Sequence, residues 1–379
     1  MKGIIATAKH HDGFCLWDTK TTDYSVKNSP FKKDVLALLR ASCDKYGLKL
    51  GVYLSPWDRH SELYGTPKYN DFYIAQMTEI LTNYGDLFCV WLDGACGAYM
   101  DGKPPQEYDF DRYYALIRKL QPNCAISNCG PDVRWIGNEG GICRDSEYNV
   151  VPKFVAHLQS IQDNSQTADG DAPKKGIGVI DQDLGSRQLL AQYEEYMWYP
   201  AEVDVSIRPG WFYHKNQDKK VRSVNNLLNI YYNSVGGNAM LLLNIPPDCE
   251  GKIANADVKR LAELTARIDS AFAKKVDIKS YNATTGKKGF EIDKLISGTG
   301  VFSPQQIDNT VIEVTFDRCV VDKLLLQEDI NFSQRIEAFD ISVGLDGKWK
   351  TVNKGTVVGH NKIALFEPIE ADCLKLEIK

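Results

Sequence analysis

The first 272 residues alternate short apolar runs with longer segments of helical periodicity, and this alternation restricts the fold more than any other feature. The apolar runs predict strands at 3–9, 48–56, 86–94, 123–128, 132–137, 201–207 and 238–244. The periodic segments predict helices near 33–46, 69–84, 108–120, 221–235 and 255–272. Strands that alternate with helices and are apolar throughout indicate a parallel sheet that is buried on both faces.

Polar or unusual residues follow the apolar runs directly, in the segments KHHDG, SPWDRH, LDGACG, IGNEGG and RPGWFYH. Clustering at the carboxyl ends of strands is typical of (β/α)8-barrel enzymes. Seven strands are one fewer than such a barrel has, so residues 1–272 predict a (β/α)8-type barrel that is one strand short. An open doubly wound sheet is the alternative, which is weakened because no GxGxxG or P-loop turn follows a strand.

The pattern changes near residue 275. Short alternating runs broken by Gly, Asn and Asp replace the helices, which predicts a C-terminal antiparallel β-sandwich over 275–379. Within it, the segment VGLDGKW predicts a hairpin with an Asp-Gly turn. The segment 162–176 is polar and contains glycine, which predicts a solvated loop. Calcium binding there is the alternative, which is weakened because the segment lacks the spacing of an EF-hand site.

Composition narrows the classes of partner. A net charge of −5, with no long run of one sign, argues against nucleic acid or anionic membrane as a partner. No apolar run approaches the length of about 18 residues that a membrane span needs. Seven Trp and nineteen Tyr raise the expectation of a sugar-binding cleft. The ten cysteines show no CxxC pair or zinc spacing and are predicted to be mostly free, buried thiols.

Two carboxylates stand out at predicted strand ends. Asp93 ends the apolar run LFCVWL, where a carboxylate is costly to bury unless it is hydrogen-bonded or used in chemistry. Glu139 lies in the Gly-rich segment that follows another strand. A helix-capping Asp and a solvated loop Glu are the structural alternatives. Two carboxylates at one barrel rim favour glycoside hydrolysis.

Neighbouring His10 and His11 follow the first predicted strand, where side chains alternate between the two faces. Both imidazoles can reach one pocket only if the strand ends there and the chain turns at Gly13. With Asp12, Asp58 and His60 they also permit a rival interpretation, a barrel metallohydrolase. Adjacent histidines diverge in direction and rarely chelate one ion together, which argues against this alternative. A nucleophile elbow of the type GxSxG is missing from the sequence.

The motifs AKHHDGFCLWDT, GVYLSPWD, VWLDGA and GPDVRWIGNEGG, in this order, resemble those of the α-L-fucosidases of glycoside hydrolase family 29. The resemblance covers most of residues 1–270. It implies that Asp93 is the nucleophile and that Glu139 is the acid/base. It further implies that His10 and His11 bind fucose hydroxyls and that Tyr53, Trp91 and Trp211 line the pocket. GPDVRWIGNEGG resembles the branch selective for α-1,3/1,4 linkages.

The resemblance implies retaining exo-hydrolysis of terminal α-1,3/1,4-linked L-fucose from oligosaccharides, with no metal or organic cofactor. Family members carry a strand and a helix before the KHHDG strand. The resemblance therefore implies that the chain is N-terminally truncated and that it forms a (β/α)8-type barrel lacking its first strand. A fucose-binding protein without turnover is the alternative function, because the expected truncation removes part of the pocket. A periplasmic or secreted location is expected from the family alone.

Overall fold

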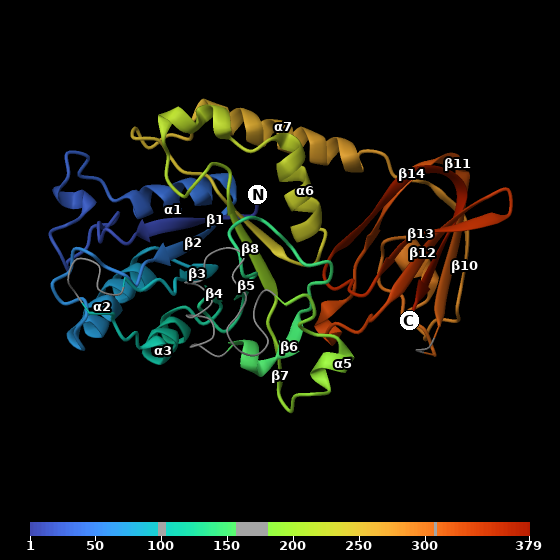
Figure 1. Cartoon of the computed structure of the whole chain (residues 1–379), viewed down its shortest axis with the longest axis horizontal. Helices are drawn as coiled ribbons and strands as arrows, with labels where there is room; N and C mark the ends of the chain where they lie inside the picture. The colour runs from blue at the N-terminus through green and yellow to red at the C-terminus, as the bar shows by residue number, and fades with distance from the viewer. Residues whose placement is uncertain (98–103, 157–180, 307–308) are drawn as a thin grey trace. The chain divides into compact units, whose positions relative to one another are not determined.

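The computed structural model describes residues 1–97, 104–156, 181–306 and 309–379. These residues form two compact units. Figure 1 shows their helices and strands, coloured by position in the chain. Met1–Gly137 and the turn at Lys153–Ala156 belong to the first unit, whereas Asn138–Pro152 and the described chain from residue 181 onward belong to the second. The predicted domain border between 272 and 275 stays a prediction, and the predicted loop at 162–176 lies outside the described residues.

A parallel sheet forms the centre of the first unit. Its strands are β1 (Gly3–Lys9), β2 (Lys49–Leu54), β3 (Cys89–Leu92) and β4 (Ala125–Asn128), side by side in chain order. All neighbouring pairs are parallel. This sheet lacks the reversal of strand order that marks a doubly wound fold. The short strand β5 (Arg134–Trp135) follows, so all five strands predicted in this region are confirmed.

Three helices connect these strands, namely α1 (Val35–Tyr46), α2 (Lys68–Asn83) and α3 (Phe110–Leu120). Local sequence sets their ends: the Asp34 carboxylate accepts from the Ala37 backbone N–H at the start of α1. Gly47 ends that helix with a φ of 64°, a left-handed conformation that glycine adopts without steric cost. Tyr73 of α2 and Tyr113 of α3 are fully buried, with ring centroids 4.7 Å apart.

The second unit contains a parallel pair of strands, β8 (Ala201–Ser206) and β9 (Met240–Asn244). Helices α6 (Val224–Ser234) and α7 (Asn255–Phe272) follow these strands, and all four elements were expected from the sequence. Three short elements that precede β8 in the chain were not expected, nor was a short helix in the C-terminal part. The three are β6 (Val150–Pro152), β7 (Tyr196–Trp198), which pairs antiparallel with β6, and the one-turn helix α5 (Arg187–Leu190).

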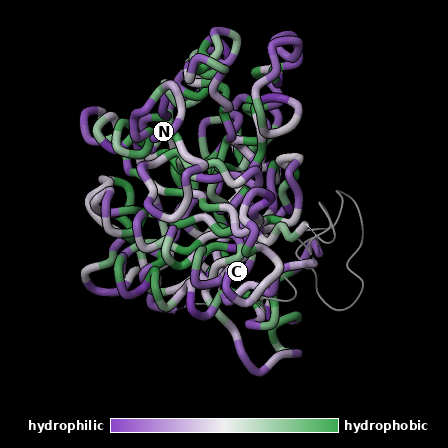
Figure 2. The backbone as a smooth tube through the Cα atoms, turned by 90° about the vertical axis from the view of Figure 1, so that its left-hand side faces the viewer, coloured by the Kyte–Doolittle hydropathy of each residue, from purple (hydrophilic) through white to green (hydrophobic). Residues whose placement is uncertain are grey.

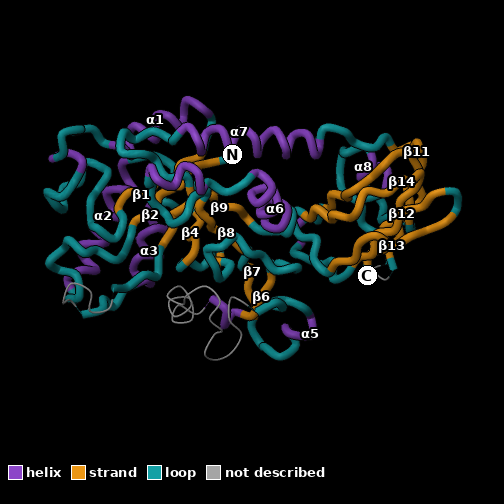
Figure 3. Tube along the Cα trace, turned by 45° about the horizontal axis from the view of Figure 1, so that its top comes forward, coloured by secondary structure: helices purple, strands orange, loops and turns teal. Residues whose placement is uncertain are grey.

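The C-terminal part of the second unit is a five-stranded antiparallel sheet. Figure 3 draws the strands of this part in orange. The order β10-β11-β14-β12-β13 joins β10 (Ile278–Ala283), β11 (Thr310–Leu326), β14 (Lys362–Ile378), β12 (Phe339–Leu345) and β13 (Lys348–Gly355). The helix α8 (Ile292–Ile296) lies between β10 and β11 in the chain. The predicted antiparallel strands are therefore confirmed.

The predicted Asp-Gly turn joins β12 to β13. Leu345 pairs with Lys348, and the two residues between them have φ of 49° (Asp346) and 77° (Gly347). Two central residues with positive φ match the right-handed twist of a tight hairpin. Phe339, Ile341 and Val343 from β12 lie in the core beneath this sheet.

Hydrophobic and hydrophilic residues alternate every few positions along the chain (Figure 2), as expected where helices and strands present one face to a core. All ten cysteines are free thiols, as predicted for most of them, and five are buried. Among the described helices, none combines the length and apolarity that crossing a bilayer requires.

Candidate active site

The chain turns at Gly13, directly after β1, as the sequence predicts. Gly13 has a φ of 85°, and its N–H donates to the carbonyl oxygen of His10 over 3.0 Å. The turn brings the imidazoles of His10 and His11 together, with ring centroids 4.0 Å apart. A second loop holds this turn in place, because the Arg59 N–H donates to the carbonyl oxygen of His11 over 2.9 Å. Both histidines therefore lie at the carboxyl end of the parallel sheet.

Asp93 lies at the same end of the sheet, directly after β3. Its Oδ2 accepts from the Tyr53 hydroxyl over 2.8 Å, and its Oδ1 accepts from the Ala95 N–H over 2.8 Å. The Oδ2 atom is also 3.9 Å from Nε2 of His11. Tyr53 is almost fully buried, so its pKa lies well above the usual value, first through burial and then through the neighbouring carboxylate of Asp93. Tyr53 therefore keeps its hydrogen and donates it to Asp93.

Trp91 lies two residues before Asp93 on the same face of β3. It is in register with Tyr53 on β2, and the two ring centroids are 5.4 Å apart. The structure thus brings together the five predicted site residues of the first unit: His10, His11, Tyr53, Trp91 and Asp93.

Both imidazoles are neutral at pH 7. Burial is the main cause of the lowered pKa of His10, against the opposing effect of Asp93. Burial, and after it the adjacent His10, lower the pKa of His11 to about 4. Neutral imidazoles have one donor and one acceptor nitrogen each, which suits the recognition of sugar hydroxyls.

Sequence reasoning missed two residues that contact His11. The Ser55 hydroxyl is 2.7 Å from His11 Nδ1, and the Trp57 ring centroid is 4.7 Å from that of His11. Trp57 also packs on Gly97, where an added Cβ would lie 2.1 Å from the indole. The segment LSPWD, which continues from β2, was the available signal for both residues.

A buried ion pair lies beside the two histidines. Nζ of Lys9, fully buried, is 3.0 Å from Oδ2 of Asp58 and donates to Oε1 of Gln76 over 2.8 Å. The other Asp58 oxygen, Oδ1, accepts from the N–H groups of His60 and Ser61. Asp58 therefore joins the end of β1 to the loop after β2. This pairing argues against the metal-ligand role that the sequence left open for Asp58.

Across the described ranges, no group of three or more His, Cys, Asp or Glu residues is arranged to hold a metal ion. The rival metallohydrolase interpretation therefore gains no support from these residues.

In the second unit, Glu139 is exposed and accepts from Nε1 of Trp211 over 3.2 Å. The loop of Glu139 is shaped by Asn138, whose Oδ1 accepts from the N–H groups of Gly140 and Ile142. Gly141 packs tightly there, because an added Cβ would lie 2.9 Å from the side chain of Ile230. The structure thus places Glu139 against Trp211, the two predicted site residues of this unit.

The loop that carries Trp211 is fixed by a buried arginine that the sequence did not indicate. Nε of Arg208 donates to both carboxylate oxygens of Asp257 on α7, at 3.0 and 2.7 Å. Its Nη2 donates to Asp218 over 2.8 Å. In addition, Asn244 at the end of β9 donates to the carbonyl oxygen of Trp211 over 3.0 Å. The position of Trp211 is therefore set by α7 and β9.

The segment 138–152, which carries Glu139, is bound to the C-terminal part of the same unit. The Asn149 N–H donates to the side chain of Gln334 over 2.9 Å, and Lys362 donates to the carbonyl oxygen of Asp145 over 3.3 Å. The hydroxyls of Ser146 and Thr356 are hydrogen-bonded as well. Residues before β14 and within it thus support the chain that follows Glu139.

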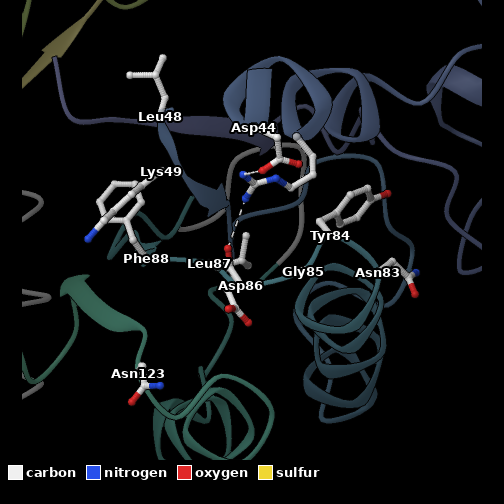
Figure 4. Close-up of a pocket in the computed structure, with 11 residues that line it drawn as sticks. Asp44, Leu48, Lys49, Asn83, Tyr84, Gly85, Asp86, Leu87, Phe88 and Asn123 are labelled. Carbon is white, nitrogen blue, oxygen red and sulfur yellow. Dashed lines mark hydrogen bonds and ion pairs between the residues drawn. The ribbon is translucent and has the colours of Figure 1, made fainter. Parts of the chain in front are cut away.

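A surface pocket of about 650 Å³ lies at the amino-terminal ends of the strands of the parallel sheet (Figure 4). Its lining includes Lys49, Leu87, Phe88 and Asn123, which lie at or just before the first residues of β2, β3 and β4. Because the strands are parallel, these residues lie at the opposite end from Asp93 and the two histidines. The pocket is therefore distinct from the candidate site, and barrel enzymes place their chemistry at the carboxyl ends.

Comparison with known proteins gives the family. The model of the family "Alpha-L-fucosidase" matches residues 1–269. Alpha-L-fucosidase 1 of Arabidopsis thaliana is 39% identical over 99% of this chain and 72% of its own length. The putative alpha-L-fucosidase 1 of Oryza sativa subsp. japonica is 37% identical over 99% and 70%, respectively.

Among solved structures, a putative alpha-L-fucosidase from Bacteroides ovatus is 42% identical, with a TM-score of 0.84. This chain is covered completely and spans 61% of that protein. A Ruminococcus gnavus fucosidase of glycoside hydrolase family 29, solved with fucose, is 27% identical, with a TM-score of 0.81. The match covers all of this chain and 79% of that protein. The chain therefore belongs to the α-L-fucosidase family, glycoside hydrolase family 29.

Proposed function

We propose that the protein is a retaining exo-α-L-fucosidase that removes terminal α-1,3/1,4-linked L-fucose from oligosaccharides and glycoconjugates. Asp93 attacks the anomeric carbon and forms a glycosyl-enzyme, while Glu139 protonates the departing oxygen. Glu139 then deprotonates the water that attacks the glycosyl-enzyme and releases fucose, so that the anomeric configuration is retained.

The surroundings of Asp93 carry this proposal. The carboxylate ends a parallel strand, accepts hydrogen bonds from Tyr53 and Ala95, and lies beside a neutral imidazole rather than a cation. These two hydrogen bonds hold the carboxylate in one orientation, as attack on the anomeric carbon requires. Among the described residues, the group of a basic side chain that lies near Asp93 is the imidazole of His11, whose Nε2 is 3.9 Å from Oδ2.

The remaining site residues bind the sugar in this proposal. His10 and His11 bind hydroxyl groups, and the rings of Tyr53 and Trp91 line the pocket. Trp211 contacts the apolar face of fucose. A family relative from Ruminococcus gnavus was solved in complex with fucose, which supports a fucose pocket in this chain.

We also propose that the strands of residues 1–272 belong to a (β/α)8-type barrel and that 275–379 forms a β-sandwich. The unreversed order of β1 to β4 supports the barrel, because a barrel is wound in one direction. A periplasmic or secreted location remains a proposal that rests on the family alone.

Substitution of the two carboxylates tests the mechanism. Asp93→Ala should abolish hydrolysis of 4-nitrophenyl α-L-fucoside, a loss of at least about 10³-fold in kcat, while fucose binding in a calorimetric titration is retained. Asp86→Ala is the matched control, because Asp86 is exposed and precedes β3 at its opposite end. Wild-type turnover in Asp93→Ala would contradict the assignment, and fucose binding without any release by the wild type would favour a sugar-binding protein.

Product analysis tests the stereochemistry and the linkage preference. Proton NMR during hydrolysis should show α-L-fucose as the first product, since retaining enzymes keep the configuration. In a ligand-bound structure the two carboxyl groups should lie about 5–5.5 Å apart. Release of β-L-fucose first would refute the retaining mechanism. Equal rates on α-1,2-linked and α-1,3/1,4-linked trisaccharides would refute the proposed selectivity.

A further inference from the structure

The hydroxyl of Ser55 lies between the His11 ring and the backbone of Trp57. Its oxygen is 2.7 Å from His11 Nδ1 and donates to the carbonyl oxygen of Trp57 over 2.8 Å. A serine hydroxyl has one hydrogen, and a carbonyl oxygen can only accept. If Ser55 donated to His11 instead, two oxygen atoms would face each other without a hydrogen, which is costly in a buried site. His11 Nδ1 therefore supplies the hydrogen for its contact with Ser55.

The Tyr53 hydroxyl is a further hydrogen-bond neighbour of Ser55. This neighbour does not change the number of hydrogens that Ser55 can donate, because the Tyr53 hydrogen goes to Asp93. If the single Ser55 hydrogen went to His11, the oxygens of both Tyr53 and Trp57 would face Ser55 without a hydrogen. Ser55 itself is fully buried, so bulk water does not offer it another partner. The chain of donors runs from His11 through Ser55 to a backbone or tyrosine oxygen, and such chains strengthen each of their bonds.

The other nitrogen of His11 faces Asp93. Nε2 is 3.9 Å from Asp93 Oδ2, which is too long for a hydrogen bond. The ring is neutral. With its hydrogen on Nδ1, Nε2 carries a lone pair, and this lone pair faces the carboxylate of Asp93. Two acceptors in this position attract a group that donates, and a sugar hydroxyl is such a group.

We propose that Ser55 is a positioning residue that fixes His11 as the Nδ1–H tautomer, so that Nε2 accepts a hydrogen bond from a substrate hydroxyl. The identity of the substrate as a fucoside rests on the proposed function, whereas the tautomer follows from Ser55 and Trp57 alone. The hydroxyl that donates to His11 has its lone pairs left to accept from a second group. The pocket thus requires a hydrogen at this position of the sugar rather than merely an electronegative atom.

NMR of the full chain with ¹⁵N-labelled histidine tests the tautomer directly. The chain has six histidines, and His11→Gln identifies the signals of His11 by their loss. Long-range ¹H–¹⁵N spectra at pH 7 should show Nδ1 protonated and Nε2 unprotonated in the wild type. Ser55→Ala should move the equilibrium toward the Nε2–H form, and Ser55→Thr, which keeps the hydroxyl, should restore it. Ser42→Ala removes an exposed helix hydroxyl on α1 and should change nothing.

Kinetics with 4-nitrophenyl α-L-fucoside tests the consequence. Ser55→Ala should lower kcat/KM about tenfold, the equivalent of one lost hydrogen bond, with Ser55→Thr within about threefold of the wild type. Of the 2-, 3- and 4-deoxyfluoro fucosides, at least one should lose affinity in the wild type and lose less in Ser55→Ala, since fluorine cannot donate.

The proposal would be overturned by an Nε2–H pattern for His11 in the wild type, or by an unchanged tautomer in Ser55→Ala. A changed tautomer with unchanged kcat/KM would refute the role in substrate binding. Failure of the proposed function is distinguishable, because a chain that hydrolyses no fucoside still reports the tautomer of His11 in the NMR spectrum.

Discussion

The Lys9–Asp58 ion pair allows a sharp test of what holds the two active-site loops together. Replacing Asp58 by Ala leaves the fully buried ammonium of Lys9 without its counter-ion, and it leaves the N–H groups of His60 and Ser61 without their acceptor. Removing one partner of a buried pair costs about 3–5 kcal/mol. That is a large share of the roughly 5–15 kcal/mol by which a domain is usually stable.

Urea-induced unfolding at pH 7, followed by tryptophan fluorescence, measures this cost. Asp58→Asn should cost less than Asp58→Ala, because the amide oxygen still accepts from the two backbone N–H groups. The double variant Lys9→Met/Asp58→Asn should recover part of the loss, since no charge remains buried. Asp44→Ala breaks an exposed i,i+4 pair with Arg40 and serves as the control, with no change expected beyond error. A loss below about 1 kcal/mol in Asp58→Ala would refute the reasoning.

Three further predictions concern other parts of the chain. Because burial lowers the pKa of His11 from 6.5 to about 4, the unfolded chain takes up a proton first as pH falls, so stability should decrease between pH 6.5 and 4 by up to about 3 kcal/mol. Urea titrations across this range should give a flatter profile for His11→Gln, and parallel profiles would contradict the assignment. Phe339→Ala should lower the free energy of unfolding by about 3–5 kcal/mol, because Phe339 is fully buried in the C-terminal core. A loss below about 1 kcal/mol in urea-induced unfolding would contradict this expectation. Asp257→Ala should raise KM for an aryl fucoside several-fold with less effect on kcat, because Arg208 no longer fixes the loop of Trp211. Asp269→Ala on the same helix is the control, and equal KM values in the two variants would contradict this role.

The order and type of the main elements could be predicted because their periodicity is strong. The first strand is found at Gly3–Lys9 as predicted, and the last helix of the series ends at Phe272. The β6–β7 pair was missed because Val150–Pro152 is three residues long and contains a proline, which offers no pattern.

The candidate site was predictable where chemistry shows in a residue type at a strand end, as at Asp93 and His11. Its supporting residues were not. Lys9 reads as an exposed lysine at the end of a strand, and only the fold shows that Asp58 and Gln76 surround it. Ser55 and Arg208 act through neighbours 44 and 49 residues away in sequence, a relation that one sequence does not reveal.

The contacts of the segment 138–152 have a consequence for how such chains diversify. The stretch that follows Glu139 is hydrogen-bonded by Gln334, Thr356 and Lys362. The C-terminal portion therefore supports the loop of one of the two proposed catalytic carboxylates. Exchanging this portion between family members without segment 138–152 would break the hydrogen bonds between the two. We expect recombined chains to fold only when segment 138–152 and the C-terminal portion come from the same parent. The two regions are then inherited together, although nearly 200 residues separate them in sequence.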